Sequence, residues 1–208
     1  MAGPRVLPSD VAFTPSVKSM QVRHGSRAAY ARLEQTTGWE TRITPECAAF
    51  IDRQTSVFLA TANLDGQPYI QHRGGPAGFL RVLDDTTIAF ADFSGNKQYI
   101  TLGNLAENPK AHLFLIDYAQ RQRIKIWGEA RAVEDDALIA VLMPGQYKAR
   151  AERAILFKVT AWDANCPRHI PHRFDGAEVA AAIDQRDRRI AELEEEVKRL
   201  RVVAGRMT

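Results

Sequence analysis

Cysteine is scarce in this sequence, and the two that occur, Cys47 and Cys166, stand far apart among 208 residues. Two thiols cannot build a disulfide framework, and the chain has neither a CxxC pair nor the Cys/His spacing of a standard zinc site. Long apolar runs are also missing. No stretch approaches the roughly 20 apolar residues of a membrane span, and MAGPRVLPSDVAF at the N-terminus lacks a signal-peptide core. These absences predict a soluble cytoplasmic protein with free thiols, no resident metal and no membrane partner.

A strong charge of one sign is absent as well. The formal net charge is +3 and the sequence pI is about 9.0, which is too mild to indicate nucleic-acid binding. Part of the positive excess lies between Arg121 and Arg131, and at Arg150 and Arg153. This clustering favours a local anion site over a long basic surface. The apolar share of 45% is ordinary for a globular protein with one substantial core.

The sequence does contain a series of short β-strand patterns. They occupy residues 56–63, 67–72, 79–83, 86–93, 111–118, 123–133 and 151–163. Asp65-Gly66 is a strong hairpin signal between the first two. Short helices are expected at 26–35, after a Thr44 cap, at about 97–106 and at 134–143. The pattern predicts a mainly β fold, in which about six or seven mostly antiparallel strands form a barrel with short flanking helices.

A long amphipathic helix is expected at the C-terminal end, where the sequence from residue 177 reads AEVAAAIDQRDRRIAELEEEVKRLRVVAG. Its apolar positions repeat at alternating spacings of four and three residues, with one charged interruption, as in a coiled-coil seam: Val179, Ile183, Arg186, Ile190, Leu193, Val197, Leu200 and Ala204. This stripe could pack back onto the barrel, but its length of about four heptads favours pairing between chains. The expected domains are therefore a helical extension (1–43), the barrel (44–175) and this helix (176–208).

The turn SGNK, residues 94–97, follows a buried strand pattern and precedes a helix expected to begin near Asn96. Free backbone amides at a helix start, a glycine and a lysine suit a phosphate group. An ordinary capped turn that binds nothing has the same composition. The turn alone therefore leaves both interpretations open.

The order of elements from 45 to 163 carries more information than the turn. A helix, a hairpin, the arginine-bearing QHRGG, then FADF, SGNK, a helix ending in NP, an apolar strand and a strand with WGEA follow one another. This order resembles the pyridoxamine 5'-phosphate oxidase-like family of FMN-binding split β-barrels. The resemblance implies a split barrel and a homodimer with FMN sites at the subunit interface.

The resemblance also implies the residues of the cofactor site. The FMN phosphate would lie among Arg73, Ser94, Asn96 and Lys97. The ring and ribityl parts would run beside His72, Gly74, Ala91 and Asp92. Arg123 of the other subunit would reach the flavin, and Trp127 and Arg131 of that subunit would line the part of the site that it contributes.

The implied function is that of an FMN-dependent oxidoreductase, in which hydride passes between an unidentified small substrate and flavin N5. No catalytic acid or base can be named from the sequence. The alternative is a non-enzymatic flavin-nucleotide carrier or redox sensor, and a deazaflavin could replace FMN.

One segment departs from the family pattern. Authentic pyridoxamine phosphate oxidases carry an arginine-leucine-histidine-aspartate-arginine run near the C-terminus, whereas this chain has WDANCPRHIPHRF at 162–174. The chain is therefore expected to be a relative with another substrate. Cys166, His169 and His172 match no standard zinc spacing, so this segment is expected to line the substrate pocket or to have a packing role.

Overall fold

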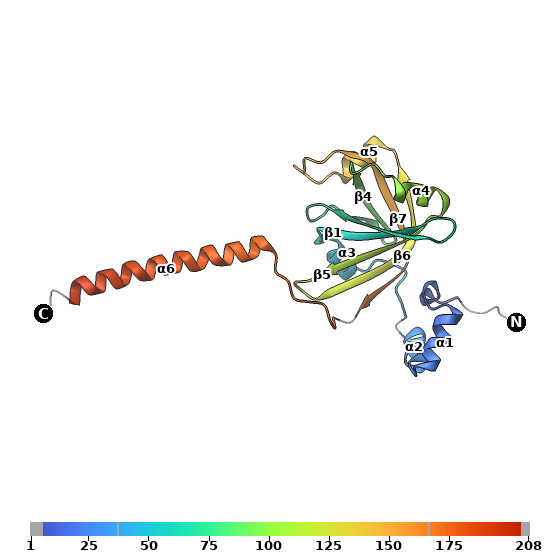
Figure 1. Ribbon diagram of the computed structural model, residues 1–208, viewed down its shortest axis with the longest axis horizontal. Coiled ribbons are helices and arrows are strands. Elements are labelled where there is room, and N and C mark those ends of the chain that lie inside the picture. The colour runs from blue at the N-terminus through green and yellow to red at the C-terminus, as the bar shows by residue number, and fades with distance from the viewer. Residues whose placement is uncertain (1–5, 37, 166, 205–208) are drawn as a thin grey trace. The chain divides into compact units, whose positions relative to one another are not determined.

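A seven-stranded sheet in which every pair of neighbours is antiparallel dominates the fold of the described residues, and it confirms the predicted mainly β split barrel (Figure 1). The computed structural model describes residues 6–36, 38–165 and 167–204. The strand order is β2-β1-β5-β6-β7-β4-β3. The strands are β1 Ser56–Ala62, β2 Pro68–Gly74, β3 Arg81–Asp84, β4 Thr87–Phe93, β5 Lys110–Asp117, β6 Gln122–Val133 and β7 Ala151–Asn165.

The helices lie close to the predicted positions, with two additions near the N-terminus. The described helices are η1 Pro8–Val11, α1 Pro15–Arg23, α2 Arg27–Gln35, α3 Pro45–Asp52, α4 Ile100–Glu107, α5 Asp136–Leu142 and α6 Gly176–Ala204. The predicted cap of α3 is present, since Thr44 Oγ1 accepts a hydrogen bond from the amide of Cys47 at 3.3 Å. Helix α1 was not predicted, because its sequence has no regular apolar stripe.

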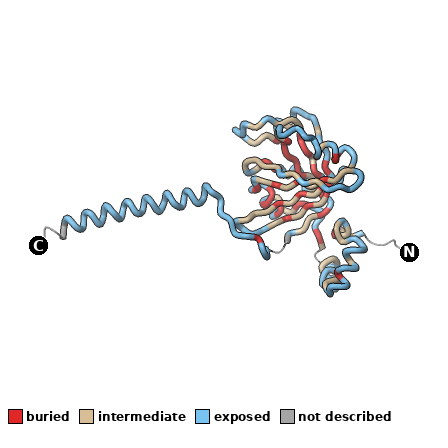
Figure 2. The backbone as a smooth tube through the Cα atoms, in the orientation of Figure 1, coloured by how far each residue is buried: buried red, intermediate tan, exposed pale blue. Residues whose placement is uncertain are grey.

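Buried residues are concentrated along the strands of the barrel (Figure 2). In β1, β5 and β6 every second residue is buried, which is the period expected when one face of a strand meets the core. Strand β4 is buried on both faces. Its Phe90 belongs to the main core, while Ala89 and Ala91 form a second cluster with Leu142 of α5 and Ala154 of β7.

Helix α4 links β1 to the edge strand β2. The side chain of Asn104 donates a hydrogen bond to Thr61 Oγ1 of β1 at 3.0 Å. The hydroxyl of Thr101, at the start of the same helix, donates to Gln71 Oε1 of β2 at 3.0 Å. Both bonds are at least partly shielded from water, so they fix the position of this helix beside the edge of the sheet.

The N-terminal extension packs on the outer face of β6. Trp39 stacks on Trp127 with ring centroids 4.6 Å apart, and Phe13 packs against Trp39. A bridge between Glu40 and Trp162 of β7, and a hydrogen bond from the Trp162 indole to the carbonyl of Arg42 at 2.8 Å, continue this contact. One face of the Trp127 ring is therefore covered by the chain's own extension.

The chain divides into two compact units, residues 1–117 with 122–168 and residues 118–121 with 169–208. Within the second unit, Arg121 Nε donates to the carbonyl of Ile170 at 3.1 Å, and the Arg173 guanidinium lies over the Tyr118 ring. Helix α6 follows. None of the helices in the described ranges combines the length and the apolarity needed to cross a lipid bilayer.

Two glycines offer a matched test of the barrel packing. The pairing of β6 with β7 shifts register between Trp127 and Gly128, where Thr160 of β7 is the extra residue, and a Cβ on Gly128 would overlap the Lys158 carbonyl and the Phe157 ring. We expect Gly128→Ala to lower the free energy of unfolding by about 1–3 kcal/mol, as overpacking does. Gly103 of α4 has open space around it, so Gly103→Ala should raise the free energy of unfolding by about 0.5–1 kcal/mol.

Urea denaturation of both variants and the wild type measures the two changes. Equal midpoints for Gly128→Ala and the wild type would contradict the tight contact between β6 and β7.

Candidate functional site

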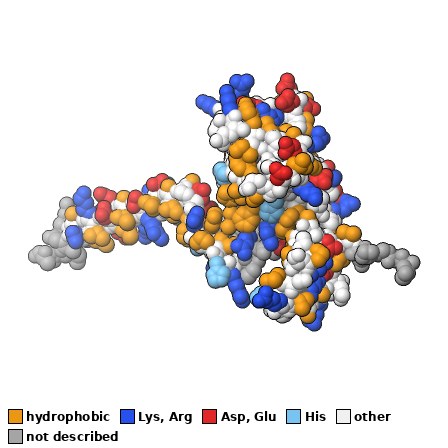
Figure 3. Space-filling view, turned by 45° about the vertical axis from the view of Figure 1, so that its right-hand side comes forward, with side chains coloured by type: hydrophobic (Ala, Val, Ile, Leu, Met, Phe, Trp, Pro, Cys, Tyr) orange, Lys and Arg blue, Asp and Glu red, His pale blue; other side chains and the backbone are white. Residues whose placement is uncertain are grey.

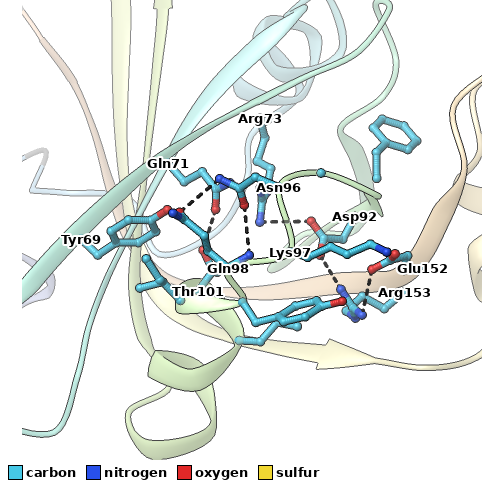
Figure 4. A pocket seen from close by; sticks show the side chains of 15 residues that line it. Tyr69, Gln71, Arg73, Asp92, Asn96, Lys97, Gln98, Thr101, Glu152 and Arg153 are labelled. Carbon is cyan, nitrogen blue, oxygen red and sulfur yellow. Dashed lines mark hydrogen bonds and ion pairs between the residues drawn. The ribbon is translucent and has the colours of Figure 1, made fainter.

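A polar pocket opens where β2, β4, β7 and the start of α4 meet (Figure 4). Since β2 is one edge of the sheet and β4 stands beside the other edge strand, the pocket lies at the seam of the split barrel. Basic, acidic and amide side chains surround it together with three aromatic rings, those of Tyr69, Phe93 and Tyr99. The lining residues on which the interpretation depends are Tyr69, Gln71, Arg73, Asp92, Asn96, Lys97, Tyr99, Thr101, Glu152 and Arg153.

Asp92 is the buried centre of this pocket. It is only 4% exposed, and it lies between two arginines from different strands. Arg73 Nη2 of β2 is 3.1 Å from its Oδ1, and Arg153 Nη1 of β7 is 3.2 Å from its Oδ2. The Arg153 pair is also fixed by register, because Asp92 and Arg153 face each other across β4 and β7.

The buried charges are not fully satisfied by hydrogen bonds. Arg73 Nε and Asp92 Oδ1 are both buried, and neither has a hydrogen-bond partner among the described residues. A buried donor on a guanidinium is costly unless it is paired. An anion in the pocket could accept a hydrogen bond from this donor.

The loop 94–99 has an unusual backbone. Lys97 and Tyr99 adopt left-handed conformations, with φ of 58° and 55°, which are uncommon for residues other than glycine and cluster at functional sites. Helix α4 therefore begins at Ile100 and not near Asn96, which corrects the predicted start. The Asn96 side chain stabilises the turn by accepting a hydrogen bond from the Gln98 amide at 3.2 Å.

Glu152 brings a second carboxylate to the pocket. A hydrogen bond from the Ser94 hydroxyl is the first cause that holds the pKa of Glu152 below its usual value, and the positive charges of Arg153 and Lys97 act in the same direction. Arg153 Nη2 is 3.1 Å from Glu152 Oε2. Three cationic side chains, Arg73, Lys97 and Arg153, thus face two carboxyl groups, those of Asp92 and Glu152.

The four residues predicted to hold a phosphate lie together. Arg73, Asn96 and Lys97 line the pocket, and Ser94 contacts it through Glu152. The amide of Ser94 donates to the carbonyl of Arg150 at 2.8 Å, so this amide is already used.

The residues predicted to lie beside the flavin ring and the ribityl chain do not share one face of the sheet. Asp92 points into the pocket, but Ala91 beside it packs against α5. His72 is exposed on the opposite face of β2 from Arg73, edge-on to Phe58 at 5.7 Å. Gly74 ends β2, and a Cβ there would press on the His72 imidazole.

The three predicted residues of β6 lie outside this pocket. Arg123, Trp127 and Arg131 share the outward face of the strand with Lys125, because the residues between them are buried. Trp127 stacks on Trp39 and meets the His112 ring edge-on at 4.9 Å. None of the three lines the Arg73 pocket of the same chain.

Sequence reasoning did not name several pocket residues. Arg153 was noted only as part of a basic cluster, since its pairing with Asp92 depends on a register between residues 61 positions apart. The period of two along β2 could have found Gln71 and Tyr69, because they share a face with Arg73. No pattern in the sequence around Glu152 or Thr101 indicated that these residues line the pocket.

The thiols and histidines form no metal site that the structure describes. No group of three or more potential ligands occurs within the described ranges, and Cys166 lies outside them. Cys47 is buried, and this burial raises the pKa of its thiol to about 12. It is therefore an unreactive core residue at neutral pH.

These features define the class: a split β-barrel with a pocket of mixed charge, rich in arginine, at its seam. The model of the pyridoxamine 5'-phosphate oxidase family matches residues 43–166, more than half of the chain. The chain belongs to this family, the FMN-binding split barrels that the order of its elements resembled. A comparison with curated protein sequences found no match.

Solved structures with a similar fold include HupZ from Group A Streptococcus, with 19% identity over 64% of this chain and 99% of that chain and a TM-score of 0.48. An FMN-binding protein from Syntrophomonas wolfei has 14% identity over 70% and 97%, with a TM-score of 0.48. The FAD binding protein from Mycobacterium smegmatis has 18% identity over 61% and 97%, with a TM-score of 0.42.

The buried carboxylate at the seam can be tested by removing its charge alone. Asp92→Asn keeps the size of the side chain but removes the carboxylate that pairs with Arg73 and leaves Arg153 with Glu152 alone, so we expect a loss of about 3–5 kcal/mol of stability. The matched control is Arg42→Ala, which breaks the exposed pair with Asp85 and should cost less than about 1 kcal/mol.

Denaturation in phosphate-free buffer compares the two variants, because an added anion could replace the lost charge. Equal losses in both variants would contradict the central role of Asp92.

His112 predicts a pH dependence of stability. Burial, with a smaller contribution from the positive charge of Lys125, lowers its pKa from 6.5 to about 4. The unfolded chain therefore binds a proton in this interval while the folded chain does not, so stability falls as the pH is lowered from 6.5 towards 4. His112→Gln cannot titrate, and its stability should fall less over the same interval.

Urea unfolding of both proteins at several pH values gives the comparison. Parallel profiles for the wild type and His112→Gln would contradict this assignment.

Proposed function

We propose that the seam pocket binds the phosphate of FMN. The observation that carries this proposal is the pair of buried arginines at Asp92, one of which keeps a buried Nε donor without a hydrogen-bond partner in the described part of the chain. A phosphate oxygen is a strong acceptor for such a donor, and a guanidinium can bind phosphate with two parallel hydrogen bonds. Lys97 adds a third positive charge at the rim.

The loop 94–99 supports the same proposal. Its two left-handed residues, Lys97 and Tyr99, both line the pocket, and residues held in such strained conformations cluster at ligand sites. Tyr99 lies beside the Arg153 guanidinium, 5.7 Å from ring centre to carbon, and so limits the movement of that cation. The pocket is thus arranged before the ligand arrives.

We further propose that the flavin ring lies between two copies of the chain. The outward residues Arg123, Trp127 and Arg131 would then serve the site of the other subunit. The outer face of β1, β2 and β5 supports a contact between copies, because Phe58 and Phe114 lie 6.4 Å apart on it and Ile70 is 61% exposed. Apolar surface of this kind is typical of an obligate dimer contact.

The proposed activity is that of an oxidoreductase for a small substrate, with FMN supplying hydride transfer at N5. The chain's own residues bind the phosphate, orient the ring and stabilise its negative charge through Arg123 or Arg131. No side chain is assigned as acid or base. The missing arginine-leucine-histidine-aspartate-arginine run favours a substrate other than a vitamin B6 phosphate.

The phosphate assignment predicts opposite effects for two substitutions at the same pocket. Lys97→Ala removes a cation and should weaken FMN binding by about 10- to 100-fold, the range for one charge-assisted hydrogen bond. Glu152→Gln removes a negative charge and should strengthen it. Riboflavin, which has no phosphate, is the matched ligand control. Its binding affinity should change little in either variant.

Fluorescence titration of the apoprotein measures these affinities, after any copurified chromophore has been released and identified. A colourless protein that takes up neither FMN nor a deazaflavin nucleotide would overturn the proposal. Equal effects of the two variants on FMN and riboflavin would show that the pocket does not hold the phosphate.

A second measurement separates an oxidoreductase from a carrier. Bleaching of the bound flavin by NADH or NADPH, faster than for free FMN, is expected if the ring is open to a hydride donor. If neither nucleotide nor sulfite, which adds to an accessible N5, bleaches the flavin, the ring is sealed and the carrier interpretation replaces the enzymatic one.

A further inference from the structure

The C-terminal helix α6 carries an apolar stripe that is exposed to solvent. Every residue of α6 whose burial is described is exposed, and apolar side chains lie along the helix between charged ones (Figure 3). The large apolar residues of the stripe are between 42% and 60% exposed: Val179, Ile183, Ile190, Leu193, Val197 and Leu200. So much apolar surface on one helix marks an interaction site.

The spacing of the stripe assigns a heptad register. Steps of four and three residues place Ile183, Ile190 and Val197 at position a. Leu193 and Leu200 then stand at position d, with Arg186 one heptad earlier. β-branched residues at a combined with leucine at d favour two parallel strands over three or four.

We propose that α6 pairs with α6 of a second copy of this chain in a parallel, in-register, two-stranded coiled coil. The proposal does not depend on flavin binding. It goes beyond a barrel dimer, because it assigns the surface, the partner and the orientation of the C-terminal helix.

The flanking charges complement this arrangement. In a parallel pair, position g of one helix faces position e of the next heptad in the partner. Arg189 then faces Glu194 of the partner subunit, and Glu196 faces Arg201 of the partner subunit. Arg189 already pairs with Glu192 of its own helix at 2.9 Å, so its guanidinium would bridge both carboxylates.

An antiparallel pair lacks this match. There, position e faces position e and position g faces position g. The register that opposes Ile190 to Leu193 sets Arg189 near Glu196 of the partner subunit. It also sets Asp187 near Glu194 of the partner subunit. Like charges at these positions are unfavourable and offset the attractive pair, so the charge pattern favours the parallel orientation, in which both charged g–e pairs are of opposite sign.

Arg186 fixes the register. In the in-register pair the two Arg186 side chains share one layer, and Asp187 at the neighbouring position e can pair with Arg186 of the partner subunit. A shift of one heptad would instead set Arg186 against Val179 or Leu193 and bury a charge on an apolar side chain. A single polar residue in the seam specifies register at some cost in stability.

Cysteine crosslinking of the full-length protein tests the orientation. In a Cys166→Ser background, Leu200→Cys places two thiols in the same d layer of a parallel pair, so oxidation should crosslink most of the protein. The control is Val202→Cys at position f, which faces away from the partner. Leu200→Cys should crosslink about 10-fold faster or more, because the coil holds its thiols at a high effective concentration.

An antiparallel pair would separate the two thiols at 200 by about 25 Å, the rise of 17 helical residues, and a helix folded back on its own chain would also separate them. Equal crosslinking of the 200 and 202 variants, or none at either, would overturn the proposal. Arg189→Glu should slow the reaction, and the added change Glu194→Arg should restore it.

The FMN titration is run on the same proteins. Selective crosslinking at 200 without FMN binding would overturn only the proposed function, and FMN binding without selective crosslinking would overturn only the coiled coil.

Discussion

The buried contact of Asp92 with Arg73 and Arg153 is the constraint on which both the barrel and its pocket depend. Strands β2 and β4 are far apart in the hydrogen-bonded order of the sheet, so no backbone ladder joins them. The Arg73–Asp92 ion pair crosses that seam, and Arg153 ties the same carboxylate to β7. Removal of one partner from an ion pair that closes a fold in this way strongly destabilises the protein, because the remaining charge stays buried.

The same constraint bears on the proposed phosphate site, in which two of the side chains are acidic. Asp92 and Glu152 hold the arginines in place, and they also reduce the net positive charge to one. A phosphate therefore gains less Coulomb attraction than three free cations would give. What the site offers is pre-organisation: the donors are already desolvated and oriented, so little conformational entropy remains to be lost on binding.

Local chemistry made the strands, the Thr44 cap and the position of the SGNK turn predictable, because alternation and capping depend on near neighbours. The start of α4 was not predictable, since nothing in the residue types of Lys97 and Tyr99 indicates left-handed backbone. Nor was Arg153, whose role depends on a register set by the whole sheet. The α1 helix was missed because its cap at Thr14 supports a segment without an apolar face.

Alternation along β6 has a further consequence for the site. Because Ile124 and Ile126 must face the core, Arg123 and Trp127 must face outward, away from the Arg73 pocket of the same chain. A flavin site that uses them needs a second copy. The proposed pairing of α6 makes the same demand independently, since in it the a and d residues of each stripe pack against those of a second α6. A parallel coil and an isologous barrel contact each have two-fold symmetry, so either contact by itself would join two copies of the chain.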